Sequence, residues 1–259
     1  MQVKITKSRE LNLLNSCNLP TCCVLSCRQT FIAKTAALLT AARSALRSAA
    51  PFAPADIAAL LRLPPPAADP ADLHRDSIAP GASVRDAAVL VLMVEREGHV
   101  NLLFTQRTEH LAAHAGQICF PGGRAEAADT GRDDTALRET EEEIGLARQH
   151  VTVLGALPEY ALGTGFRITP VVGWIKAPFD TRPDPYEVAE IFELPLSHFI
   201  DTARYQRHEY HFNGRHRHYV AIPYEGRYIW GATAGMLLSL ARVLSARTAR
   251  TARAERSTV

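Results

Sequence analysis

The sequence predicts a layered domain of the α+β or α/β class. Apolar residues make up 47% of the 259 residues, which is enough for a buried core. Several segments have the composition of β-hairpins, and two or three others have the apolar spacing of helices. Because a sheet and a helix each bury one apolar face, this mixture favours a sheet covered by helices.

The first expected elements are two helices and a hairpin. Residues 35–48 place their apolar side chains on one side of a helix, and residues 54–61 are a second short helical stretch that three consecutive prolines at 64–66 end. Residues 87–94 form an unbroken apolar run with branched side chains, which predicts a buried strand. Residues 100–105 have the same character and follow a short charged turn, so we expect the two strands to form a hairpin.

A glycine-rich turn and a helix come next. Phe120-Pro121-Gly122-Gly123 predicts a tight turn, in which glycine lets the backbone approach a ligand. A polar loop to about Asp134 leads into a helix that ends at Ile144. Gly145 can adopt the left-handed conformation that terminates helices, so we place the end of the helix there.

The second half of the chain predicts further strands and one more helix. These are strands at residues 151–157, 171–175, 205–212 and 215–222 and an apolar helix at 233–244. Asn213-Gly214 separates the last two strands and is a strong signal for a two-residue hairpin turn. We expect the arginine-rich tail after the helix to be frayed.

The expected domain organisation has four parts. They are an extension at residues 1–30 that is disordered or dispensable, a helical segment and linker at 31–82, the folded domain at 83–246 and a basic tail at 247–259. The extension has no alanine and holds four of the five cysteines, which are Cys17, Cys22, Cys23 and Cys27. Their spacing lacks the paired Cys-x2-Cys of zinc sites, so we do not expect a metal there.

Charge and hydropathy argue against two classes of protein. The 29 basic and 27 acidic side chains leave a net charge of +2, and no segment matches a nucleic-acid-binding motif. The longest wholly apolar run has eight residues, whereas a membrane-spanning helix needs about 20. With no signal peptide, membrane span or disulfide framework in view, we expect a cytoplasmic protein that binds neither nucleic acid nor membranes.

The acidic segment at residues 138–145 is the most informative one for function. On a helix, Glu139, Glu142 and Glu143 are spaced i, i+3 and i+4, which places three carboxylates on one face. They lie in the last turns, where the helix dipole disfavours each anion by roughly 0.3–1 kcal/mol. A hard cation such as Mg²⁺ or Mn²⁺ would compensate. The alternative is an ordinary solvated acidic face.

Two motifs flank an acidic loop, and they are Gly122-Gly123 and Arg138-Glu139-x-x-Glu142-Glu143-x-Gly145. Together they resemble the signature box of the Nudix hydrolase superfamily. That family has a glutamate eight residues before the arginine, where this chain has Thr130 preceded by Asp129. The resemblance implies an α+β fold, an α/β/α sandwich with a mixed central sheet flanked by helices. It also implies Mg²⁺- or Mn²⁺-dependent hydrolysis of a nucleoside diphosphate linked to another moiety.

Three segments at or before the box resemble an additional motif of the coenzyme A diphosphatases within this superfamily. They are Leu103-Phe104-Thr105-Gln106-Arg107-Thr108, His114-Ala115-Gly116-Gln117 and Phe120-Pro121-Gly122-Gly123. Later segments at 187–196 and 229–234 are also similar, so the resemblance covers residues 87–244. It implies hydrolysis of coenzyme A, or a derivative, to 3′,5′-ADP and 4′-phosphopantetheine. Those enzymes often have a basic residue just before His-Ala-Gly-Gln, where this chain has Ala112 and Ala113.

The resemblance and the chemistry of the side chains give each candidate residue a role. We expect the metal ligands to be Glu139, Glu142 and Glu143. We expect the catalytic residues to be Glu142, Arg138 and Glu187, with Arg138 orienting the glutamates or steadying the loop and Glu187 acting as a base or a further ligand. The expected substrate contacts are Arg107, Gly116, Gly122 and Gly123. Arg107 fits equally well a salt bridge to a helix.

Two other functions stay open at this point. A Nudix hydrolase could act on NADH or ADP-ribose instead, and a catalytically silent domain could bind a nucleotide as a sensor. The expected partner is a small-molecule substrate. Related enzymes are commonly dimers, so the resemblance also implies a homodimer.

Two further features allow several interpretations. The hairpin histidines could bind a metal, lie near a 3′-phosphate or simply alternate on an exposed strand, and they are His208, His211, His216 and His218. Cys119 is expected to be a small buried hydrophobe, because His114 alone is weak evidence for a thiol nucleophile.

Overall fold

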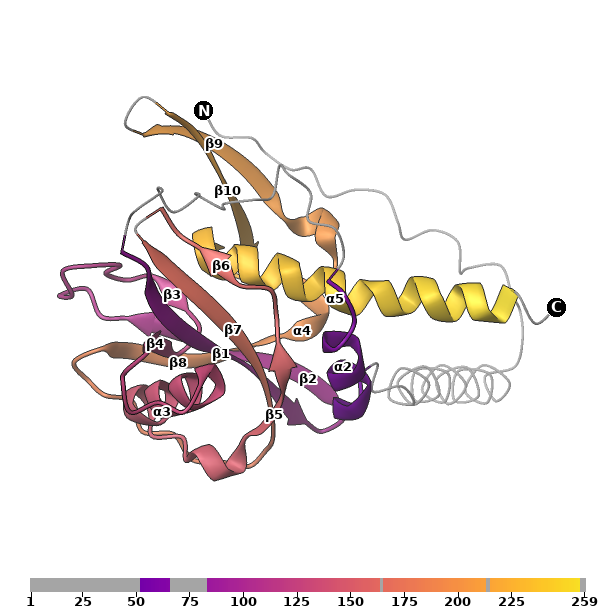
Figure 1. Ribbon diagram of the computed structural model, residues 1–259, viewed down its shortest axis with the longest axis horizontal. Helices are drawn as coiled ribbons and strands as arrows, with labels where there is room; N and C mark the ends of the chain where they lie inside the picture. The colour runs from indigo at the N-terminus through magenta and orange to yellow at the C-terminus, as the bar shows by residue number, and fades with distance from the viewer. Residues whose placement is uncertain (1–51, 66–82, 164, 213–214, 257–259) are drawn as a thin grey trace, which may run out of the picture. The chain divides into compact units, whose positions relative to one another are not determined.

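The computed structural model describes residues 52–65, 83–163, 165–212 and 215–256. Figure 1 draws the remaining residues in grey. The cysteine-rich extension, the predicted helix at residues 35–48, most of the linker and the Asn213-Gly214 turn lie outside the described residues, so these stay predictions.

A mixed sheet forms the centre of the fold. Its central path runs β3-β2-β1-β7-β5, and β4 pairs with β1, β6 with β7 and β8 with β2. The strands are β1 (Arg85–Arg96), β2 (His99–Arg107), β3 (Ile118–Cys119), β4 (Gly122–Arg124), β5 (Thr152–Ala156), β6 (Tyr160–Ala161), β7 (Phe166–Lys176) and β8 (Val188–Pro195). β1 and β7 are parallel along their whole length, and the other pairs are antiparallel. β1 and β2 confirm the predicted hairpin.

The two faces of β1 pack against different helices. Leu90 lies in the apolar cluster that includes residues of α3 (Arg132–Ile144). Val91 points to the opposite face and lies in the cluster that includes residues of α5 (Gly231–Arg256). Figure 1 accordingly places α3 and α5 on opposite sides of the sheet. This arrangement confirms the predicted α+β fold with a mixed central sheet between helices.

The side of the sheet that packs against α5 carries further elements. Two short helices lie there, α2 (Pro54–Leu61) and α4 (Leu196–Phe199). A second, three-stranded sheet has the order β11-β10-β9 and consists of β9 (Gln206–Phe212), β10 (Arg215–Tyr224) and β11 (Arg227–Trp230). β9 and β10 are the strands predicted on either side of Asn213-Gly214.

The predicted helix ends are right for two helices and wrong for the third. α2 has the predicted bounds, and α3 ends at Ile144 with Gly145 at a left-handed φ of 66°. α5 continues to Arg256 instead of ending at residue 244 in a frayed tail. The tail is rich in alanine and arginine, which both favour helices, so its basic character does not end the helix. Neither α5 nor any other described helix has the length and apolar character needed to cross a membrane.

The structure also corrects the predictions for two segments. Of the tight turn expected at residues 120–123, only Pro121 forms a bend, because Gly122 and Gly123 begin β4, which pairs antiparallel with β1. The sequence does not predict β8 as a strand, since Glu190 and Glu193 interrupt its apolar pattern. Glu187 lies in the turn immediately before β8. β3, β6 and β11 were also missed, because strands this short carry no periodic signal.

Candidate active site

Arg138 joins the acidic side chains in the C-terminal half of α3. Its Nε donates a hydrogen bond to Asp129 Oδ1 at 2.8 Å, and its Nη2 donates to the carbonyl of Arg124 at 3.0 Å. Nη1 donates to Glu142 Oε2 at 2.9 Å, and Nη2 donates to Glu139 Oε1 at 3.1 Å. One guanidinium therefore steadies the loop and also orients two of the glutamates, so the structure combines the two arrangements that the sequence left open.

Asp129 lies next to the position where the family pattern has its loop glutamate. Arg138 is the main cause that holds the pKa of this carboxyl well below its usual range. The backbone N–H of Glu126 and the hydroxyl of Thr135 also donate to Asp129 Oδ2, at 2.9 and 2.8 Å. Asp129 thus ties the loop to α3. Thr130, at the family's glutamate position, donates its backbone N–H to Asp134 at 2.9 Å instead.

Glu143 is the buried member of the cluster. Burial raises the pKa of its carboxyl to about 7, and repulsion by Glu187 and Glu139 acts in the same direction. The backbone N–H of Gly122 opposes this shift by donating to Glu143 Oε2 at 3.1 Å. Burial and nearby negative charges both make this carboxyl costly to ionise. Carboxyl groups with such a raised pKa are typical of functional sites.

Gly122 and Gly123 lie between β1 and the glutamates. A Cβ on Gly122 would stand 2.4 Å from the Ala88 carbonyl oxygen, and its φ of +149° is rare for other residues. A Cβ on Gly123 would stand 2.3 Å from Glu139 Oε2. The absence of side chains at these positions therefore lets β4 pair with β1 while Glu139 and Glu143 pack against its backbone.

Gly123→Ala is expected to reduce activity with little loss of stability. The added methyl group meets the flexible end of Glu139 rather than backbone, so the carboxylate can move aside but leaves its position. We expect a drop in turnover of about 10-fold or more, because small displacements of functional groups are costly. Steady-state rates and thermal unfolding of the purified variant would check this, and unchanged turnover would contradict it.

Arg107 and Glu187 complete the charged cluster from the sheet side. Arg107 ends β2, and its Nη1 lies 3.7 Å from Glu143 Oε1 while its Nη2 lies 3.7 Å from Glu187 Oε2. Thr108 holds the turn that carries Glu187, since its backbone N–H donates to the Glu187 carbonyl at 3.0 Å and its hydroxyl donates to the Tyr186 carbonyl at 2.7 Å. Arg107 thus lies within salt-bridge distance of two carboxylates, and its expected contact with the substrate stays a prediction.

Two predicted site residues lie apart from the buried carboxylates. The Glu142 side chain is 60% exposed and turned toward Arg138. Gly116 packs against the carboxylate of Glu109, and its carbonyl accepts from Gln106 at 3.4 Å. Within the part of the chain that the structure describes, no three acidic, histidine or cysteine side chains are grouped so that they could hold a metal ion. The role of the three glutamates as metal ligands therefore stays a prediction.

Asp129 and Thr108 are residues of the site that the sequence did not assign. Asp129 had a signal, because it neighbours the position of the expected loop glutamate. Thr108 had none beyond its place after Arg107, since its partners lie in a turn distant in sequence. Such contacts depend on how β2 and β8 pair.

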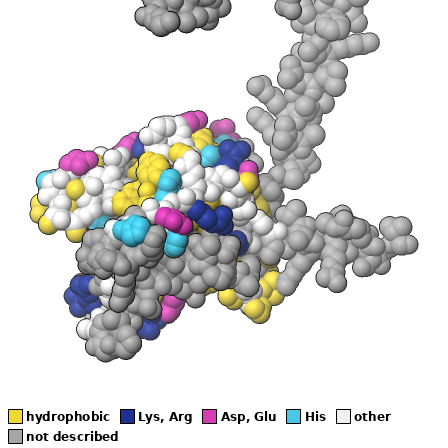
Figure 2. All heavy atoms as spheres, turned by 90° about the horizontal axis from the view of Figure 1, so that it is seen from above, with side chains coloured by type: hydrophobic (Ala, Val, Ile, Leu, Met, Phe, Trp, Pro, Cys, Tyr) yellow, Lys and Arg dark blue, Asp and Glu magenta, His cyan; other side chains and the backbone are white. Residues whose placement is uncertain are grey.

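Among the side chains that the structure describes, Cys119 and the hairpin histidines form no group that could hold a metal ion. Burial raises the pKa of the Cys119 thiol to about 11, so little thiolate forms at neutral pH. Among the described hairpin side chains, His208 stacks on Tyr219, with ring centroids 4.9 Å apart, and His218 Nδ1 lies 3.4 Å from Glu209. Figure 2 shows histidine side chains interspersed with acidic and basic ones. The exposed-strand interpretation fits these contacts.

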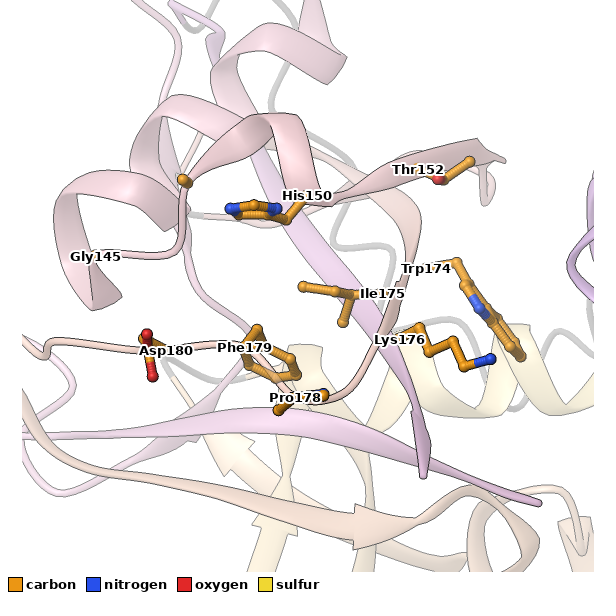
Figure 3. Close-up of a pocket in the computed structure, with 10 residues that line it drawn as sticks. Gly145, His150, Thr152, Trp174, Ile175, Lys176, Pro178, Phe179 and Asp180 are labelled. Atoms are coloured by element: carbon orange, nitrogen blue, oxygen red, sulfur yellow. The ribbon is translucent and has the colours of Figure 1, made fainter. Parts of the chain in front are cut away.

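A pocket of about 520 Å³ lies beyond the C-terminal end of α3. Figure 3 shows His150, Trp174 and Lys176 among the side chains that line it. Gly145, which follows the last residue of α3, lines this pocket. None of the clustered glutamates lines the pocket. We place the candidate active site at the glutamates, because the reactive side chains converge there.

Comparisons with known proteins identify the family of the chain. Residues 84–220 match the model of the NUDIX domain family. The chain is 40% identical over 165 residues to the uncharacterized Nudix hydrolase NudL of Yersinia pestis and to that of Yersinia pseudotuberculosis. These alignments cover 63% of this chain and 82% of the relatives. The chain therefore belongs to the Nudix family, which supports a hydrolase that acts on pyrophosphate bonds.

Solved structures of the same family resemble the chain more distantly. An Ap4A hydrolase of C. elegans in a binary complex is 22% identical, with a TM-score of 0.37, over 44% of this chain and 82% of that one. A MutT/nudix family protein of Enterococcus faecalis is 13% identical, with a TM-score of 0.39, over 64% of each chain.

Proposed function

We propose that this protein hydrolyses the diphosphate of coenzyme A, or of a derivative, to 3′,5′-ADP and 4′-phosphopantetheine with the aid of Mg²⁺ or Mn²⁺. One observation carries the proposal. The segments that resemble the coenzyme A motif meet the Nudix box at Glu143, since Arg107 of the first segment lies 3.7 Å from this carboxylate and Gly122, which both motifs share, donates its N–H to it. The parts of the sequence that indicate substrate and chemistry thus converge on one side chain.

The acidic side chains offer the donor chemistry that a hard divalent cation prefers, although no three of them are grouped around one point in the described part of the chain. Glu139, Glu143 and Glu187 offer only oxygen donors. Burial raises the pKa of Glu139 and of Glu143, and repulsion from Glu187 acts in the same direction on both. A cation would relieve this repulsion. We assign it to Glu139, Glu142 and Glu143, with Glu142 turning from Arg138. Bound there, it supplies charge neutralisation of the diphosphate and activation of water.

The protein side chains have separate tasks in this proposal. Glu187 is 41% exposed and held by Arg107 and Thr108, so it can accept a proton from water at the edge of the cluster. Arg107 presents two guanidinium nitrogens beside the same carboxylates, and this geometry suits a phosphate oxygen of the substrate. Arg138 keeps Glu139 oriented while its bonds to Asp129 fix the loop.

A substrate panel tests the proposal against another Nudix activity. We expect kcat/KM for coenzyme A to exceed that for NADH and for ADP-ribose, measured with the full chain and Mg²⁺ or Mn²⁺. Arg107→Ala should weaken coenzyme A hydrolysis, because it removes the guanidinium beside the carboxylates. A preference for NADH or ADP-ribose would overturn the assignment of coenzyme A and leave a Nudix hydrolase.

The burial of Glu143 predicts that the metal-free protein loses stability as the pH rises. The pKa of Glu143 is about 7 in the folded chain, against an ordinary value of 4.5. The folded state therefore holds this proton more tightly than the unfolded state does. Its stabilising contribution is complete below about pH 4.5 and is lost as the pH rises to about 7. The loss amounts to roughly 3 kcal/mol.

Denaturant unfolding in EDTA measures this contribution. We expect a lower free energy of unfolding at pH 8 than at pH 5, and Glu143→Gln should remove most of the difference. Saturating Mg²⁺ or Mn²⁺ should restore stability at pH 8. Carboxyls whose pKa is lowered, such as Asp129 and Glu193, act below this pH window. A wild-type protein that gains stability from pH 5 to pH 8 in EDTA would contradict the prediction.

A further inference from the structure

Two aromatic side chains meet beside the candidate active site. Tyr186 precedes Glu187 in the turn before β8, and His110 lies in the loop that follows Arg107 at the end of β2. Their ring centroids are 4.8 Å apart, and the rings are tilted by 57°. Figure 1 shows this loop and this turn at the same end of the main sheet. His110 is therefore three residues from Arg107 in the sequence, and Tyr186 is the neighbour of Glu187.

Tyr186 is exposed although its backbone is firmly held. The residue is 65% exposed, which makes it the most exposed large hydrophobic residue among those that the structure describes. The Thr108 hydroxyl donates to its carbonyl at 2.7 Å, and its own N–H donates to Asp184 Oδ1 at 2.8 Å. An aromatic ring that is fixed at its backbone and left open to water loses little entropy when a ligand covers it.

We propose that Tyr186, supported by His110, is the surface on which the heteroaromatic base of the substrate stacks. This inference rests on the proposed function, because a nucleoside diphosphate derivative carries a flat base at a short distance from its phosphates. Arg107 ends the strand that leads into the loop of His110, and Glu187 follows Tyr186 in the turn before β8. In this proposal the phosphates bind beside these two charged side chains, which lie 3.7 Å apart. An aromatic ring can stack on any base, and this stacking adds binding affinity without taking part in the chemistry.

The pantetheine arm is the other part of coenzyme A that could cover an exposed apolar surface. It is aliphatic and has no ring to place over Tyr186, whereas a purine presents a flat face of matching size. We therefore assign the Tyr186 surface to the base. Binding of a ligand that has the base, compared with binding of one that lacks it, tests whether the base covers Tyr186.

Calorimetric binding of two ligands to the full chain with Mg²⁺ tests the inference. The ligands are AMP and ribose 5-phosphate, which differ in the base. We expect Tyr186→Ala to weaken AMP binding by about 10-fold and to leave ribose 5-phosphate binding unchanged. Tyr186→Phe keeps the ring and should bind AMP as the wild type does. Tyr228→Ala is the matched control, since Tyr228 is 45% exposed and lies in β11 near His208.

Several outcomes would overturn the inference. They are undetectable AMP binding by the wild type at millimolar concentration, unchanged AMP binding by Tyr186→Ala, and an equal loss of both ligands. An equal loss would mean that Tyr186 orders the turn of Glu187 instead. Because binding is measured without turnover, a wild type that binds AMP through Tyr186 but does not cleave coenzyme A refutes only the proposed function. In an active enzyme, Tyr186→Ala should raise KM for coenzyme A more than it lowers kcat.

Discussion

Glu142→Gln is expected to lower coenzyme A hydrolysis by about 100-fold or more while leaving the stability of the fold nearly unchanged. In the proposed role, Glu142 holds a metal ion whose charge would stabilise the transition state by several kcal/mol, and each 1.36 kcal/mol is a factor of ten in rate. The Glu142 side chain is 60% exposed, and its ion pair is with Arg138, which keeps its bonds to Asp129. Exposed substitutions of this kind usually change stability by less than about 0.5 kcal/mol.

Glu141→Gln is the matched control for Glu142→Gln. Glu141 is the adjacent residue of α3, but its carboxylate accepts from Arg148 Nε at 2.8 Å rather than from Arg138. We expect this variant to keep normal turnover in the same assay. Near-normal turnover by a folded Glu142→Gln variant would refute the assignment of Glu142, and an equal loss in both variants would point to a general effect of charge on the helix.

Gly122→Ala is expected to destabilise the protein by about 3 kcal/mol, the largest effect on stability that we predict. The added Cβ would lie 2.4 Å from the Ala88 carbonyl oxygen and 2.5 Å from Val89 Cα, which are backbone atoms of β1 that cannot move aside. The backbone φ of +149° adds strain for any residue with a side chain. Backbone strain and overpacking each cost roughly 1–3 kcal/mol. Movement of β4 would also remove the Gly122 N–H from Glu143.

Gly131→Ala provides a comparison at an open position. No atom lies within 4 Å of a Cβ built there, and its φ of 168° is extended backbone that any residue adopts. We expect the free energy of unfolding of this variant, measured with denaturant, to stay within about 1 kcal/mol of the wild-type value. Equal stability of Gly122→Ala and the wild type would contradict the tight packing of β4 on β1.

The acidic helix could be predicted from the sequence because its determinants are local. The i, i+3, i+4 spacing of three glutamates and the terminating Gly145 specify α3 and one of its faces without reference to any other element. The same holds for the β1–β2 hairpin and α2. Resemblance to the family box then supplied the expected chemistry of the helix.

The contacts that complete the site could not be predicted because they join distant segments. Glu187 meets Arg107 only when β8 pairs with β2, and β8 has no clean apolar alternation. The bonds from Arg138 to Asp129 and to the Arg124 carbonyl depend on how the loop folds back on α3. The close packing of Gly122 on β1 likewise requires β4, a strand too short for a sequence signal.

Product analysis of coenzyme A incubated with the full chain tests the central claim most directly. With Mg²⁺ or Mn²⁺ present, we predict stoichiometric release of 3′,5′-ADP and 4′-phosphopantetheine, detected by mass spectrometry, and neither product in EDTA. Chain that binds coenzyme A in the presence of metal but releases no 3′,5′-ADP would contradict the account and identify a nucleotide-binding sensor instead.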